Sequence, residues 1–126
     1  MSATLTPKAA LAALGKAWDA LDVEQLAAVF ADDAVVIDPL LPRQARGRDD
    51  IRELYTPSMA ELSTCQVTLT NVVTSGDLGM AEGRFESALA GDDGRLDFDF
   101  AMTVELRDGQ VVRLSEYYDT RPLLPA

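Results

Sequence analysis

A stretch of strict alternation in the C-terminal half of the chain constrains the fold most. Between residues 96 and 106 every second position is large and apolar, and the positions between them are charged, polar or small. The apolar set is Leu96, Phe98, Phe100, Met102, Val104 and Leu106. A period of two is typical of a β-strand with one buried face. Since a single strand cannot bury that face alone, the segment predicts a sheet with a second layer packed on it.

The segments on either side share this period. We expect strands at about 64–74, 78–90, 95–107 and 110–120, joined by short runs of turn-forming residues. The last connection contains Asp108-Gly109, a pair typical of tight β-hairpins. The four strands should therefore form an antiparallel meander.

The N-terminal half has the spacing of helices instead. Thr6 followed by Pro7 is typical of a helix start, and Asp22 is placed to cap a second helix. The apolar face of this second helix would be Leu26, Val29 and Phe30. The segment "ADDAVVIDP" then predicts a short strand that ends at its proline.

A third helix is expected after "RGRDD". Its apolar stripe is Ile51, Leu54, Tyr55, Met59 and Leu62. Pro57 lies inside this helix and should kink or split it near Thr56. Helices and strands are thus segregated, in the order ααβαββββ, which predicts an α+β fold. We expect one domain, residues 1–126, with three helices packed on a curved antiparallel sheet.

The available residue types exclude several kinds of chemistry and partner. The chain has no histidine and one cysteine, Cys65, which excludes serine–histidine and cysteine–histidine catalysis and leaves little besides carboxylates as ligands, which disfavours a zinc site. We therefore expect no metal and no cofactor. The net charge of −10 disfavours nucleic acid and anionic membrane surfaces as partners. No apolar run approaches the roughly 20 residues of a membrane span, and "MSATLTPKAALAAL" lacks a signal-peptide pattern, so we expect a cytoplasmic protein.

Two carboxylates stand out because apolar residues flank them. In "AVVIDPLLP" four apolar residues lead into Asp38, which is either a strand-end residue in water or a carboxylate in an apolar pocket. In the last strand one face carries Val112, Leu114, Glu116 and Tyr118. If Leu114 faces the core, so does Glu116, which either pairs with an arginine at the open end of the sheet or lines a pocket. The same alternation places Asp97 and Asp99 on the opposite, outer face.

The stretches "DVEQLAAVFADDAVVIDP", "GRDDIRELY" and "RDGQVVRLSEYYD" together resemble the NTF2-like superfamily, specifically its SnoaL-like and ketosteroid-isomerase-like branch. The resemblance implies a cone-shaped α+β roll, of the cystatin-like kind, and a homodimer formed through the sheet face. It also implies that Asp38 matches the aspartate that shuttles protons in the isomerases, and that Tyr55 matches a tyrosine supporting their oxyanion hole. The implied pocket lining is Leu14, Trp18, Leu54, Tyr55, Phe85, Phe100, Met102, Leu114 and Tyr118.

The chain departs from the isomerase pattern at the oxyanion hole. Leu14 and Met102 stand where the isomerases have a tyrosine and a protonated aspartate, and neither side chain can donate a hydrogen bond to an enolate. Tyr118, Tyr55 or a protonated Glu116 would have to replace those donors. Cyclases of the SnoaL branch commonly pair their aspartate with a histidine, which this chain lacks.

Three functions are compatible with these residues. The first is a cofactor-free isomerase, dehydratase or cyclase that acts on an apolar carbonyl compound, such as a polyketide, terpenoid or steroid-like molecule. Its catalytic residues would be Asp38 as general base, with Glu116 and Tyr118 as acid or oxyanion donor. The second is a pocket that binds an apolar ligand without chemistry, and the third is a dimeric interaction module.

Overall fold

The sheet defines the architecture of the computed structural model, which describes residues 4–41, 43–91 and 93–121. Its elements are α1 (Pro7–Ala20), α2 (Val23–Ala27), β1 (Phe30–Ile37), β2 (Ala45–Arg46), α3 (Gly47–Ala60), β3 (Leu62–Ser75), β4 (Leu78–Leu89), β5 (Phe98–Arg107) and β6 (Gln110–Tyr118). The six strands are ordered β2-β1-β6-β5-β4-β3. The α+β class, with helices against a curved sheet, is confirmed.

The predicted meander of β3 to β6 is confirmed, with every neighbouring pair antiparallel. The expectation of an entirely antiparallel sheet was wrong at β1, which runs parallel to β6. Parallel strands need a long crossover, and here α3 and the meander supply it. The expected order also lacked β2, whose two residues are too few to show a period.

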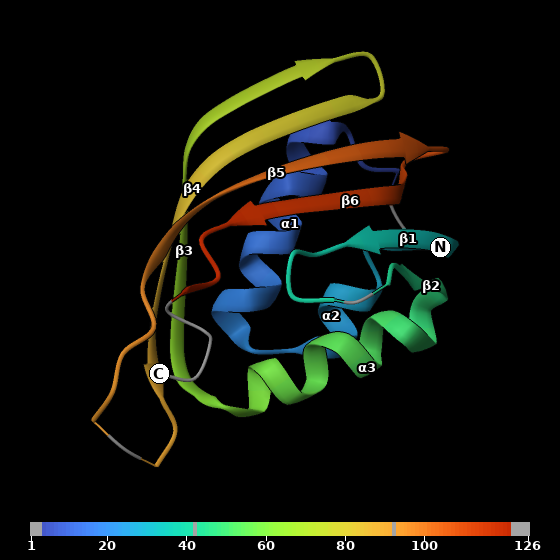
Figure 1. The fold of residues 1–126 in the computed structure, drawn as a ribbon. Coiled ribbons are helices and arrows are strands. Elements are labelled where there is room, and N and C mark those ends of the chain that lie inside the picture. The colour runs from blue at the N-terminus through green and yellow to red at the C-terminus, as the bar shows by residue number, and fades with distance from the viewer. Residues whose placement is uncertain (1–3, 42, 92, 122–126) are drawn as a thin grey trace.

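Curvature of the sheet creates the space in which the helices pack. Figure 1 shows the long strands bending so that α1 lies inside their curve, while α3 lies at the lower end. Helix α1 packs on β3, β4 and β5, and α3 packs on β1, β2 and β3.

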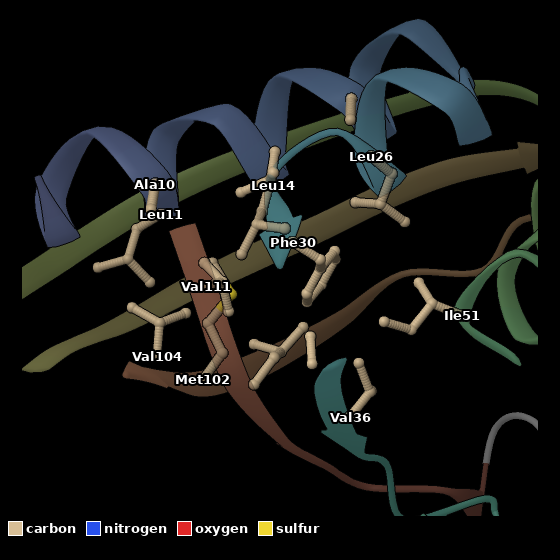
Figure 2. Packing of buried hydrophobic residues seen from close by; sticks show 14 of the residues in the cluster. Ala10, Leu11, Leu14, Leu26, Phe30, Val36, Ile51, Met102, Val104 and Val111 are labelled. Atoms are coloured by element: carbon tan, nitrogen blue, oxygen red, sulfur yellow. The ribbon is translucent and has the colours of Figure 1, made fainter. Parts of the chain in front are cut away.

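The core fills the interior between α1 and the sheet (Figure 2). Its fully buried side chains include Leu11, Leu26, Phe30, Val36, Ile51, Val104 and Val111. Each such side chain contributes roughly 1.5–3 kcal/mol over an exposed one. The apolar face predicted for β5 points into this core, with Met102, Val104 and Leu106 buried.

The starts of α1 and α2 are as expected, whereas α3 already begins at Gly47, inside the segment after which it was expected, and two of the helix ends also differ. Thr6 Oγ1 accepts a hydrogen bond from Ala9 N at 3.1 Å, and Asp22 Oδ1 accepts from the first turn of α2. Helix α2 ends at Ala27, so Val29 and Phe30 are buried by the entry into β1 and not by a helical face.

Helix α3 also differs from its prediction. It runs unbroken from Gly47 to Ala60, so Pro57 does not split it. The proline stands in the last turn, where the helix continues for only three more residues and loses little hydrogen bonding. Leu62 opens β3 and does not extend the helical stripe.

A bulge corrects the expected orientation of one residue in β6. Leu106 pairs with Val111 while Glu105 pairs with Arg113, so Val112 is an extra residue in the strand. Val111, and not Val112, is therefore fully buried. The hairpin before it is as predicted, since Asp108 and Gly109 both have positive φ, 54° and 76°.

Candidate functional site

A cavity of about 240 Å³ lies between the sheet and the helices α1 and α3. All the residues assigned to the site from the sequence line it, namely Leu14, Trp18, Asp38, Leu54, Tyr55, Phe85, Phe100, Met102, Leu114, Glu116 and Tyr118. The wall is mostly apolar, and its polar groups lie at the ends of β1 and β6 and in or directly after the C-terminal half of α3. Such a combination of an apolar wall and a few convergent polar groups is typical of a small-molecule site.

The parallel pairing of β1 with β6 brings the two carboxyls together. Val36 pairs with Leu114 and Ile37 with Ser115. Continuing that register by one residue places Asp38 beside Glu116, both on the face that points into the cavity. Asp38 is 9% exposed. The alternative of a strand-end carboxylate in open water therefore does not describe this residue.

Two tyrosines hold the carboxyl pair. The Tyr118 hydroxyl donates to Asp38 Oδ1 at 2.8 Å, and the backbone N–H of Leu40 donates to the same oxygen at 2.9 Å. The Tyr55 hydroxyl donates to Glu116 Oε1. The partner of Glu116 is thus Tyr55 of α3. It is not an arginine, which was one of the two alternatives expected from the sequence. Among the described residues no buried side-chain polar atom lacks a partner.

Burial raises the pKa of Glu116 to about 8, and the neighbouring charge of Asp38 adds to this shift. A hydrogen bond between the two carboxyls raises it further, because that bond needs a proton, while the bond from Tyr55 acts the other way. Glu116 therefore carries a proton at neutral pH, beside Asp38. Burial also raises the pKa of Tyr55 and of Tyr118, so both hydroxyls remain donors.

Five aromatic rings form a belt that runs from Tyr55 to Tyr118. Trp18 meets Tyr55 edge to face with centroids 5.6 Å apart, and it meets Phe85 in the same way at 5.3 Å. Phe85 stacks on Phe98 at 4.7 Å, and Phe98 lies 5.1 Å from Tyr118. Such contacts contribute about 0.5–1.5 kcal/mol each beyond burial and fix the directions of the tyrosine hydroxyls.

Some lining residues were missed from the sequence. Phe98 belongs to the same strand face as Phe100, so the alternation could have identified it. Leu40, Ser58 and Glu61 are exposed residues of the lining, in loops or at a helix end where no periodic signal exists. Asp97 and Asp99 lie outside the cavity, paired with Arg95 at 3.1 Å and Arg84 at 3.3 Å.

The chemistry open to this site is that of carboxyls and hydroxyls. Within residues 4–41, 43–91 and 93–121 no group of three or more His, Cys, Asp or Glu side chains is arranged to hold a metal ion. The burial of Cys65 raises its pKa to about 12, so it is a poor nucleophile. None of the helices in the described ranges has the length and apolarity that crossing a membrane requires.

This geometry defines a class of domain, namely an α+β roll whose pocket opens between its helices and its curved sheet. The sequence matches the model of the SnoaL-like domain over residues 11–114, and the chain belongs to that family. Its fold is NTF2-like, as the resemblance implied. No curated protein matches the sequence.

Solved structures support the fold at low sequence identity. A protein with a ketosteroid isomerase-like fold from Catenulispora acidiphila, in complex with trimethylamine, is 22% identical, with a TM-score of 0.81 over 94% of this chain and 91% of that one. An LEH-like epoxide hydrolase of M. tuberculosis is 19% identical, with a TM-score of 0.73 over 88% of this chain and 80% of that one. TerC, co-crystallised with polyporic acid, is 20% identical, with a TM-score of 0.72 over 88% and 89%. At these identities the likeness establishes the fold alone.

Proposed function

We propose that this protein is an enzyme that moves a proton on an apolar carbonyl compound, with Asp38 as the general base. The observation that carries the proposal is the carboxyl pair: Asp38 and Glu116 lie side by side in an apolar cavity, and two tyrosine hydroxyls and the backbone N–H of Leu40 donate hydrogen bonds to them. Pairs of carboxyls whose environments separate their pKa values are typical of acid–base sites. The reaction would be an isomerisation, a dehydration or an aldol-type ring closure.

Each group has a role in the proposed step. The Asp38 carboxylate removes a proton from the carbon next to the carbonyl group. Protonated Glu116 turns its O–H from Asp38 to the carbonyl oxygen and stabilises the enolate that forms. Tyr118 positions Asp38, and Tyr55 positions Glu116. Glu116 would thus supply the donor that Leu14 and Met102 cannot, and Asp38 would return its proton at another carbon.

The size of the cavity limits the substrate. A cavity of about 150 Å³ accepts benzene, and pockets for drug-sized ligands start at about 300 Å³. A space of about 240 Å³ therefore suits one or two rings. A larger polyketide or terpenoid would have to project past the exposed Leu40 and Glu61.

The elementary step can be tested before the natural substrate is known. We would incubate one- and two-ring ketones with the protein in D₂O and follow exchange of the α-protons by NMR. Asp38→Asn should slow this exchange about 10²-fold or more, the usual contribution of a general base, while ligand-induced thermal shifts persist. Asp99→Asn is the matched control on the outer face. Equal exchange rates in wild type and Asp38→Asn would remove Asp38 as the base.

The pH dependence tests Glu116 separately. If the protonated form assists, exchange should decline as the pH rises through about 8, and this decline should be absent in Glu116→Gln. A wild-type rate that keeps rising to pH 9 would contradict the acid role of Glu116.

A binding pocket without chemistry is the second candidate. The apolar Leu14 and Met102 favour it, because both are buried where the isomerases place their donors. In that case ketones would shift the melting temperature of wild type and Asp38→Asn alike, and neither protein would exchange α-protons.

We also propose that two copies pair through the outer face of the sheet. Val73, Leu78, Met80 and Tyr117 are exposed there and line one shallow groove.

A further inference from the structure

The cavity has an uncompensated negative charge. Asp38 and Glu116 lie inside it and Glu61 lines it, while no lysine or arginine among the described residues does so. The ion pairs that the structure describes involve neither Asp38 nor Glu116. Buried carboxylates are normally paired with a cation. Here the proton held at Glu116 is what limits the charge of the pair.

The aromatic belt provides the second half of a cation site. Trp18, Phe85 and Phe98 line the cavity that contains the carboxyls, and aromatic rings attract positive charge over their faces. The net charge of −10 draws cations toward the molecule as a whole. The same negative charge repels anions, both at the surface and at the carboxyl pair.

We propose that this cavity binds lipophilic organic cations, either protonated or quaternary amines, whose positive charge replaces the proton of Glu116 beside Asp38. The apolar part of the ligand would lie against the aromatic belt, and the ammonium group would face the two carboxyls. One proton leaves Glu116 for solvent as each cation enters, so charge balances at the site. This inference requires the cavity and its charges, and it does not require catalysis.

The proton release gives the proposal a distinctive signature. The titratable groups that line the cavity together with Glu116 are Asp38 at the end of β1, Tyr55 on α3, Glu61 after α3, and Tyr118 on β6. The tyrosine pKa values are raised, the chain has no histidine, and the pKa of Glu116 is raised to about 8, so we expect Glu116 to release its proton as the pH passes through that value. Cation affinity should therefore rise with pH, by up to about tenfold per unit, and level off above about pH 8.

Isothermal titration calorimetry with benzyltrimethylammonium tests this directly, because that ion keeps its charge at every pH. Its matched neutral and anionic probes are 4-phenyl-2-butanone and 3-phenylpropanoate. At pH 7 we expect the cation to bind at least about tenfold tighter than the anion and, in phosphate compared with Tris buffer, to release up to one proton. Glu116→Gln should bind without proton release and without the pH dependence, and Asp38→Asn should bind at least about tenfold more weakly.

The outcomes separate this proposal from the proposed enzyme. Cation binding that is independent of pH in wild type, or no tighter than binding of the anion, overturns the proposal, whether or not the variants fold. Unchanged affinity in folded Asp38→Asn also overturns it, with Asp99→Asn as the control for charge removal elsewhere. Cation binding with proton release but without α-proton exchange would support the cation site and contradict only the proposed enzyme activity.

Discussion

At the scale of single residues, Glu116 should determine how stability depends on pH. Its pKa is about 8 in the folded protein and about 4.5 in the unfolded chain. The folded state therefore binds more protons between these values, and the stabilisation is complete below pH 4.5 and lost as the pH rises to 8. The carboxyls whose pKa values are lowered, Asp33, Asp50, Asp97 and Asp119, act at more acidic pH.

Urea unfolding at pH 5, 6.5, 8 and 9 measures this effect. The free energy of unfolding should fall by a few kcal/mol from pH 5 to 8, since one pKa unit corresponds to about 1.4 kcal/mol, and then level off. Glu116→Gln, which cannot ionise, should show a flat curve over this range, and Asp99→Asn should follow the wild type. Constant or rising wild-type stability between pH 5 and 8 would mean that Glu116 does not retain its proton.

At the scale of elements, Gly83 keeps β4 close to its neighbours. A Cβ at this position would lie 2.6 Å from Phe100 Cζ and 2.6 Å from Thr68 O. Gly83→Ala should therefore destabilise the protein by about 1–3 kcal/mol through overpacking, measured by chemical denaturation. Gly15→Ala is the comparison, because its Cβ would lie 3.3 Å from Val67 Cγ1 and alanine favours the α1 helix. A Gly83→Ala protein as stable as Gly15→Ala would show that Phe100 and the backbone at Thr68 can both move without cost.

The elements that the sequence predicts well are those with local signals. Thr6 and Asp22 cap helices through their own side chains, and Asp108-Gly109 adopts the positive φ of a tight hairpin. The parallel position of β1, the two-residue β2 and the bulge at Val112 depend on distant partners. The break expected at Pro57 does not occur, because the cost of a proline inside a helix depends on its distance from the helix end.

At the scale of the whole molecule, only part of the site can be predicted from the sequence. Strand alternation assigns Leu114, Glu116 and Tyr118 to the inner face, and the cavity wall follows from that. The contact between Asp38 and Glu116 needs the register of β1 on β6, and the bond from Tyr55 needs the placement of α3 on the sheet. No local pattern contains either relation, although both determine the charge state of the pocket.

The outer face of the sheet carries an apolar patch on which two copies of the chain could pair. Val73, Leu78, Met80 and Tyr117 are 50–58% exposed and surround a shallow groove that also contains Glu105 and Arg113. Apolar residues gathered on one sheet face mark an interaction site. In a twofold pair the same patch meets itself, so Glu105 of one copy can approach Arg113 of the other.

Sedimentation velocity at tens of micromolar should give a species of twice 13.6 kDa. Met80→Asp should shift this species toward the monomer, because a buried and unpaired carboxylate opposes association. Ala9→Asp adds the same charge on an exposed position of α1 and should leave the dimer intact. A wild type that sediments as a monomer would refute pairing through this face, and equal dissociation of the two variants would assign the effect to net charge instead of the groove.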